Sequence, residues 1–134
     1  FKDYGTVTAN SSGTAITPDT NANTKGAFAE LSSSTALPIH EMLISIQGST
    51  ATAAAGSAYL IDIAVGAAGS ERVVYSNYPM KSYAYIALEA MFYSFPMYLP
   101  MSFQIPVGSR LSARCQADQA SSDAIEIAVT GITY

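Results

Sequence analysis

The single histidine of the sequence, His40, is the first residue to test for chemistry. Nucleophilic hydrolysis of the Ser–His–Asp kind requires an imidazole that a carboxylate positions. The adjacent carboxylate, Glu41, is poorly placed for that role, because successive side chains of a β-strand point to opposite faces of the sheet. The pattern therefore favours a structural histidine at the end of an apolar stripe, and we expect no catalytic residue and no enzymatic activity.

The acidic residues could in principle supply the carboxylate pair of a glycosidase. They stand singly, however, at outward positions on the expected strands or at strand ends, as do Asp62, Glu71, Glu89 and Glu126. Isolated carboxylates of this kind are typical of a solvated surface. The spacing therefore favours solvated acids over an acid–base pair.

One segment has the spacing of a calcium-binding loop. In residues 19–30, oxygen-bearing side chains occupy the first, third, fifth and twelfth positions, which are Asp19, Asn21, Asn23 and Glu30. Loops that wrap a hard cation use this spacing. The sixth position is Thr24, where the sharp turn requires glycine, and nothing around the segment predicts flanking helices. Asp and Asn are also ordinary loop residues, so we expect no metal site here.

The single cysteine, Cys115, excludes an internal disulfide and a multi-cysteine zinc site. It lies in an alternating segment in which one face carries Leu111, Ala113, Cys115 and Ala117. A buried, small apolar side chain is the favoured interpretation of such a position. The residue types therefore predict no cofactor.

Charge is scarce throughout the chain. Charged residues make up 12% of the 134 residues and hydrophobic residues 49%, and the formal net charge is −4. A solitary domain needs more surface charge to stay soluble, so we expect a homo-oligomer. No two of the six basic residues are adjacent, which argues against nucleic acid as a partner.

No window of about 18 apolar residues predicts a membrane helix, and the first residues lack the pattern of a secretory signal.

Two regions of the chain differ in composition. Residues 5–26 are rich in Thr, Ser, Asn, Ala and Gly and carry few large apolar side chains. Such a segment buries too little apolar surface to hold itself in a core. We therefore expect an extended N-terminal arm over residues 1–26 and one β-sandwich domain over residues 27–134.

The second region shows the period-two alternation of β-strands. Alternating or strand-like segments cover residues 37–47, 58–65, 71–76, 83–92, 101–105, 110–117 and 124–133, with turn residues between them. About seven or eight short strands are the pattern of an all-β antiparallel sandwich. A helix over residues 84–91 is the alternative there, since Ala, Leu, Glu and Met favour helices, but the flanking tyrosines favour a strand.

Nine aromatic residues gather between Tyr75 and Phe103. Tyrosine combines contact area with a hydroxyl group, which suits protein interfaces and sugar-binding grooves, although core packing accounts for several of these residues. Residues 93–101 include Pro96 and Pro100, which block regular sheet pairing, so we expect part of this run in a loop at an interface. The candidate interface residues are Tyr93, Phe95, Met97, Tyr98 and Leu99.

Two segments resemble tailed-bacteriophage virion proteins. Residues 59–70 are similar to a strand that ends in a Gly-Ala-Gly turn, and residues 103–116 contain Ile-Pro-Val-Gly-Ser-Arg, similar to a recurrent turn between strands of those proteins. The resemblance covers residues 37–133 and implies a jelly-roll-like sandwich that serves as a capsid decoration (cement) protein or as a tail or fibre module. The matching positions shape turns, so no functional residue is implied: they are Gly66, Gly69, Pro106 and Gly108.

These observations lead to two expectations for function. The first is a structural virion protein on the capsid surface, which binds the major capsid protein or another virion protein and stabilises the phage head shell, with a homotrimer as the favoured assembly. The alternative is a carbohydrate-binding β-sandwich of a phage tail or fibre. The absence of tryptophan is unfavourable to the alternative, because stacking on sugars commonly uses large aromatic faces.

Overall fold

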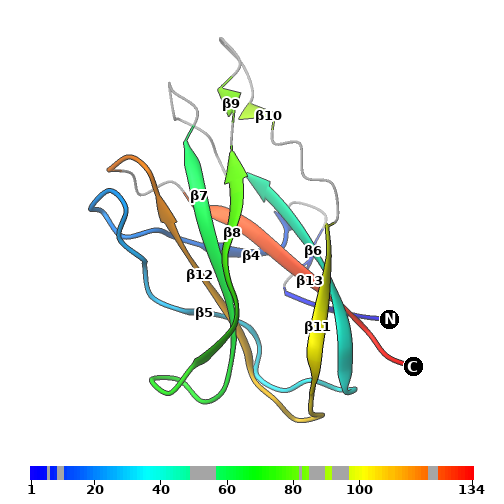
Figure 1. The fold of residues 1–134 in the computed structure, drawn as a ribbon. Coiled ribbons are helices and arrows are strands. Elements are labelled where there is room, and N and C mark those ends of the chain that lie inside the picture. Colours follow the sequence, from blue (N-terminus) through cyan, green and yellow to red (C-terminus); the bar gives the residue numbers. More distant parts are fainter. Residues whose placement is uncertain are drawn as a thin grey trace.

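The computed structural model describes residues 1–5, 7–8, 11–48, 57–81, 83–84, 90–91, 97–120 and 124–134. These residues form β-strands and connecting turns and no helix. Two antiparallel sheets face each other, as Figure 1 shows. The all-β antiparallel sandwich that the alternation predicts is therefore confirmed.

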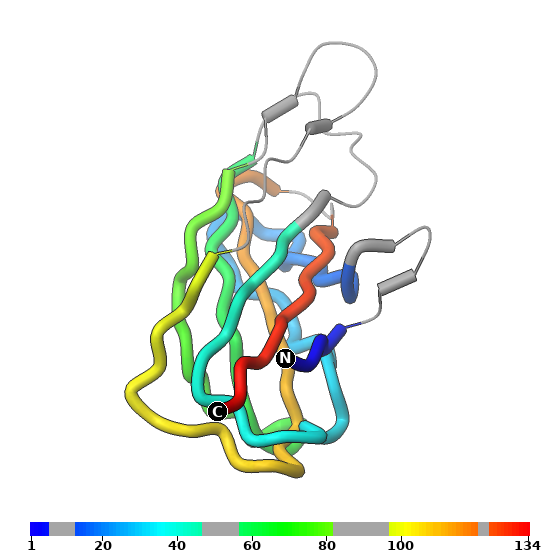
Figure 2. Tube along the Cα trace, turned by 90° about the vertical axis from the view of Figure 1, so that its right-hand side faces the viewer, coloured from blue at the N-terminus to red at the C-terminus, as the bar shows by residue number. Residues whose placement is uncertain are grey.

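The first sheet has five strands, which are β1 (Lys2–Tyr4), β4 (Thr14–Ile16), β6 (Ile39–Gly48), β11 (Met97–Ile105) and β13 (Ile125–Ile132). β13 pairs with β6 on one side and with both β1 and β4 on the other, and β6 pairs in turn with β11 at the edge. Figure 2 looks onto this sheet, with both chain ends in front.

The second sheet has four strands, which are β5 (Ala29–Ser32), β7 (Ala58–Val65), β8 (Arg72–Lys81) and β12 (Leu111–Ala117), in the order β5-β12-β7-β8. Two short ribbons lie outside the sheets: β2 (Val7–Thr8) with β3 (Ser11–Ser12), and β9 (Tyr83–Ala84) with β10 (Ala90–Met91). β9 and β10 are strands at the two ends of the segment for which a helix is the alternative. Residues 85–89 of that segment lie outside the described residues.

The order in which the strands pair is that of a jelly roll. Four strands of the first half pair with four of the second half in reverse order: β4 with β13, β5 with β12, β6 with β11 and β7 with β8. Such pairing folds a long antiparallel hairpin across two sheets. As a result, β8 and β11 are edge strands on the same side of the sandwich, and a groove lies between them.

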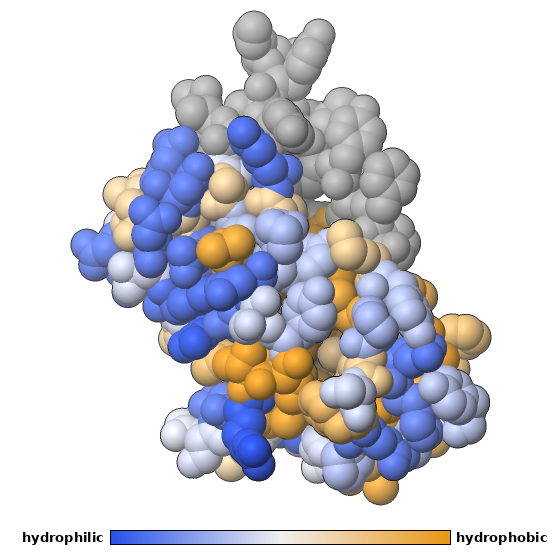
Figure 3. All heavy atoms as spheres, in the orientation of Figure 1, coloured by the Kyte–Doolittle hydropathy of each residue, from blue (hydrophilic) through white to orange (hydrophobic). Residues whose placement is uncertain are grey.

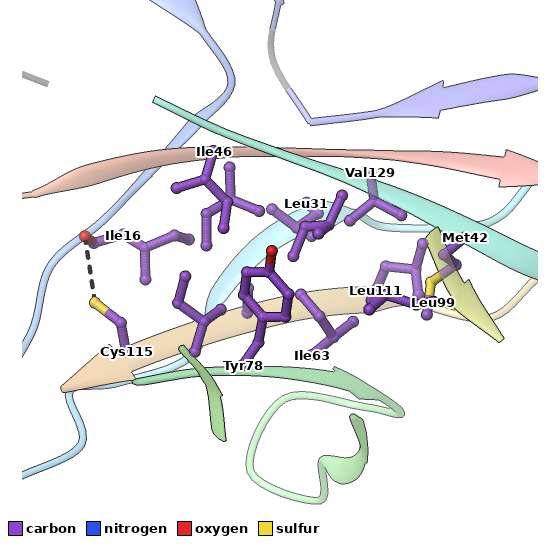
Figure 4. Packing of buried hydrophobic residues seen from close by; sticks show 14 of the residues in the cluster. Ile16, Leu31, Met42, Ile46, Ile63, Tyr78, Leu99, Leu111, Cys115 and Val129 are labelled. Atoms are coloured by element: carbon purple, nitrogen blue, oxygen red, sulfur yellow. Dashed lines mark hydrogen bonds between the residues drawn. The ribbon is translucent and has the colours of Figure 1, made fainter. Parts of the chain in front are cut away.

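The core lies between the two sheets and consists of alternate residues of each strand. On β6, Met42, Ile44 and Ile46 are buried, whereas Leu43 between them is partly exposed. Figure 4 shows such side chains from both sheets packing around Tyr78. β-branched side chains suit these positions because they pack well on a pleated surface. The alternation visible in the sequence thus sets which face of β6 is buried.

The N-terminal segment differs from the extended arm that its composition predicts over residues 1–26. β1 and β4 both pair with β13 and both contribute to the core: Tyr4 is 4% exposed and Ile16 is fully buried. Gly13 permits this course, because a Cβ atom there would lie 2.5 Å from the carbonyl group of Ile127. β13 supplies the backbone hydrogen-bond partners that a segment of low hydrophobicity needs to join a sheet.

Candidate protein interface

β11 is the edge strand that contains the described part of the aromatic and proline-rich run. Its pairing with β6 has the register Met97–Ile44, Tyr98–Leu43, Leu99–Met42 and Pro100–Glu41. Pro100 therefore lies within a strand and not in the loop that the two prolines predict. An edge strand accommodates proline because only one of its two sides is hydrogen-bonded to a neighbour.

The five predicted interface residues have different positions. Tyr93 and Phe95 lie outside the described residues. Met97 and Tyr98 are 47% and 46% exposed and stay candidates. Leu99 is fully buried and points into the core (Figure 4), which corrects its assignment to the interface. The reason is the alternation of the strand, which turns the side chain after Tyr98 toward the opposite face.

Tyr98 belongs to a cluster around the carboxylate of Glu41. The hydroxyl group of Tyr134 donates a hydrogen bond to Glu41 Oε1 at 3.3 Å. A hydrogen bond with Glu41, together with desolvation, raises the pKa of Tyr98 to about 12. The pKa of Tyr134 is also raised, by desolvation and by the charge of Glu41. Both phenols therefore stay protonated at neutral pH and donate toward one carboxylate.

His40 is the stacking partner of Tyr134. Their ring centroids lie 4.7 Å apart, and the ring planes are inclined by 21°. The stack and the hydrogen bond to Glu41 hold the last residue of the chain against the first residues of β6. This contact supports a structural role for His40.

The outer face of the five-stranded sheet is otherwise poor in charge. Two adjacent rows of paired residues cross its centre, Tyr98–Leu43–Thr130 and Pro100–Glu41–Ile132. Among the described residues, its charged side chains are the carboxylates of Asp3, Glu41 and Glu126. Lys2 is two residues before the buried Tyr4 and shares its side of β1, so it points away from this outer face. The face is acidic and elsewhere uncharged.

A groove of about 340 Å³ opens between the edge strands β8 and β11. Its walls are mainly apolar and consist of Val65, Val73, Val74, Phe103, Ile105 and Pro106, with Arg72 and Gln104. Val73 and Phe103 are 41% and 46% exposed. In Figure 3, hydrophobic colour gathers in the lower half of this view, around the beginning of β8, with hydrophilic residues beside it. We call this feature the β8–β11 groove.

On the opposite side of the sandwich, residues 17–28 lead into β5 and lie beside β12. The backbone N–H groups of Asn23 and Gly26 donate to the carbonyl oxygens of Ala117 and Cys115 on β12, at 2.7 and 2.8 Å. These bonds fix the segment to β12 as a strap. Gly26 also lets the two ends of the strap approach each other, because a Cβ atom there would lie 2.2 Å from the carbonyl oxygen of Thr17.

Asp62 binds the strap through an ion pair with Lys25. Its side chain is almost fully buried, with Lys25 Nζ at 2.8 Å from one oxygen and Arg114 Nε at 2.9 Å from the other. Burial alone would raise the pKa of this carboxyl, but hydrogen bonds from Lys25, the Asn77 backbone and Arg114 lower it below its ordinary value. Both oxygens of Asp62 are thus engaged within the protein, which indicates a structural ion pair and not a free acid.

The two acids of the calcium-like segment make separate contacts. Asp19 Oδ1 accepts hydrogen bonds from the backbone and side-chain nitrogens of Asn21 at 2.8 and 2.9 Å. Glu30 Oε2 instead lies 2.8 Å from Arg110 Nε. Across the described ranges, no group of three or more His, Cys, Asp or Glu residues could hold a metal ion.

Cys115 is fully buried, and its position confirms the interpretation as a small apolar core residue. Its Sγ atom lies 3.7 Å from the carbonyl oxygen of Ile16 (Figure 4). Burial raises the pKa of this thiol to about 12. The thiolate needed for reactivity is therefore scarce at neutral pH.

Sequence reasoning missed four residues of these surfaces: Glu41, Tyr134, Arg72 and Phe103. Glu41 and Tyr134 are 93 residues apart in the chain, and the groove joins strands from different sheets. No local pattern relates residues at such separations. The one available signal was the aromatic content of residues 75–103, which includes Phe103.

The comparisons with known proteins add no relationship: no family model, no curated protein and no solved structure matches this chain. Within the part of the chain that the structure describes, no helix has the length and apolar character to cross a membrane.

Proposed function

We propose that this protein is a structural virion protein, a capsid decoration (cement) protein that binds the major capsid protein or another virion protein and stabilises the phage head shell. The observation that carries the proposal is the outer face of the edge strand β11, where Tyr98 is 46% exposed and Pro100, two residues further on, is exposed beside it. Apolar side chains grouped at the surface mark protein contacts. The jelly-roll pairing supports the proposal, because viral capsid domains use this arrangement.

The proposed role is adhesion without catalysis. Several charged side chains form ion pairs with one another: Asp62 with Lys25 and Arg114, and Arg110 with Glu30 and Glu71. Such pairs stabilise the positions of loops and strands. The resemblance of residues 59–70 and 103–116 to phage virion proteins points in the same direction.

The test uses purified protein and phage heads that lack it. Co-sedimentation and electron microscopy of the mixed sample should show the protein bound to the heads, and the decorated heads should withstand a higher temperature before they release DNA. The Tyr98→Asp variant should bind at least about tenfold more weakly, because an unpaired charge would be buried in the contact. Thr20→Asp adds the same charge to an exposed residue of the strap and should bind like the wild type. Wild-type protein that stays in the supernatant at every concentration would refute the proposal.

A second candidate function is carbohydrate binding, favoured by the placement of Tyr98 and Tyr134 around Glu41. Aromatic rings stack on sugar faces, and a carboxylate accepts hydrogen bonds from sugar hydroxyl groups. Titration with a panel of oligosaccharides should then show a heat of binding that Glu41→Gln abolishes. No heat with any sugar at about 10 mM, a concentration that detects even millimolar affinity, would remove this candidate.

A further inference from the structure

We propose that copies of this chain associate head to tail, with the outer face of the five-stranded sheet of one copy, around Glu41, seated on the β8–β11 groove of the next copy, beside Arg72. This inference rests on the homo-oligomer that is part of the proposed function, and it names the two surfaces that join.

We expect the partner of the β8–β11 groove to bind through its side chains and not by backbone pairing with an edge strand. Val73 and Phe103 expose apolar surface there, which is unfavourable in water. Addition of a further strand to either edge is hindered, because Pro79 on β8 and Pro100 on β11 lack a backbone N–H group. β8 also has irregular register against β7 on both sides of Ile63. The occupant should therefore present a face and not an edge strand.

The charge at the groove indicates an acidic partner. Lys25 and Arg114 pair with Asp62, and Arg110 pairs with two glutamates. Arg72, in contrast, is exposed at the groove and forms no ion pair with any residue that the structure describes. A face that carries a carboxylate among apolar groups would complement it.

The outer face of the five-stranded sheet has these properties. Glu41 lies between Pro100 and Ile132 in one row, next to a row that contains Leu43 and Tyr98. The other charged side chains described on this face are also carboxylates. The outer face of a second copy is therefore complementary to the groove. Association would bury both surfaces, which agrees with the low content of charged residues, 12%.

The position of the two surfaces determines the kind of assembly. They adjoin along β11: Tyr98 belongs to the outer face, whereas Phe103 lines the groove. Because the surfaces differ, each copy uses its face on one neighbour and its groove on the other. Such heterologous contacts close into rings when the rotation between copies allows it, and a trimer is the smallest such ring.

Charge reversal tests the pairing. Arg72→Glu and Glu41→Arg should each raise the concentration for half-association at least about tenfold, as measured by light scattering and sedimentation of proteins whose circular dichroism matches the wild type. The double variant Arg72→Glu/Glu41→Arg should recover most of the loss, because it restores opposite charges. Gln119→Glu, an exposed change elsewhere, should leave association unchanged. Phe103→Gln should weaken association without affecting the ion pair, and serves as the test if a charge variant does not fold.

Three results would overturn the inference. The wild-type protein could be monomeric at high micromolar concentration, or the single variants could associate like the wild type. The third result is a double variant that associates no more tightly than the single variant with the weaker association. Binding to phage heads is measured separately by co-sedimentation. A wild-type protein that binds heads but does not self-associate refutes only the head-to-tail contact. Intact self-association without head binding refutes the proposed function and leaves the contact in place.

Discussion

Lys25 and Asp62 are 37 residues apart in the sequence, and their charged atoms lie 2.8 Å apart in the structure. The ion pair joins the strap, residues 17–28, to β7. Asp62 is buried, and its second oxygen pairs with Arg114. One carboxylate thus pairs with two cations and fixes a segment that has little apolar surface of its own.

Replacement of this carboxylate should destabilise the fold. Asp62→Asn leaves Lys25 and Arg114 without their common partner, and we expect the free energy of unfolding to fall by about 3 kcal/mol. Chemical denaturation measures the change. Glu30→Gln removes one acid of the more exposed Arg110 pair and should lower stability by less than about 1 kcal/mol. Equal effects of the two substitutions would contradict the special role of Asp62.

The stability of the protein should depend on the ionisation of Asp62 in acid. The pKa of this carboxyl is lower in the folded protein than its ordinary value of 3.8, so the folded state favours the charged form. The stabilisation is complete above the ordinary pKa and is lost as the pH falls through the lowered value. Melting temperatures from pH 6 down to 2 should therefore drop more steeply for the wild type than for Asp62→Asn. If the melting temperatures of both proteins fall equally with pH, other carboxylates determine the loss of stability in acid.

The thiol of Cys115 should be protected in the folded protein. It is fully buried, and burial raises its pKa to about 12. We expect negligible reaction with a thiol-specific disulfide reagent at pH 8 and complete reaction in denaturant. Rapid labelling of the native protein would mean that the strap and β4 open readily above this residue.

Neighbouring residues of β11 should respond in opposite ways to charge. Leu99→Asp places a carboxylate in the core and should prevent folding, because a buried unpaired charge is unfavourable by several kcal/mol. Tyr98→Asp should fold, since Tyr98 is 46% exposed, while assembly or capsid binding weakens. Circular dichroism and light scattering separate the two outcomes. A misfolded Tyr98→Asp would make Tyr98 a core residue and remove it from the interface.

The N-terminal segment should contribute to stability. Ile16 on β4 is fully buried, and we expect Ile16→Ala to lower the free energy of unfolding by about 2 to 4 kcal/mol. Ala15→Ser, on the exposed side of the same strand, should change it by less than about 0.5 kcal/mol. A negligible effect of Ile16→Ala would return the segment to the extended arm that its composition predicts.

The fold class could be predicted because alternation is a local property. On β6, the buried Met42, Ile44 and Ile46 recur at every second residue, and the same period places Cys115 in the core. The alternation of β11 is visible too, but Pro100 within it and Pro96 before it in the sequence obscure it: they predict a loop around Pro100, whereas an edge position allows a strand there.

The sequence by itself determined the strand-rich class, the buried face of the main strands and the scarcity of charge. These follow from the order of neighbouring side chains, since burial of apolar surface selects one face of a strand wherever the chain places it. Only the tertiary structure decided that Ile16 and Leu99 are buried in the core and that Tyr134 forms a hydrogen bond with Glu41. Those contacts depend on which distant strands pair, and pairing is set by the combined packing of both sheets and not by any single segment.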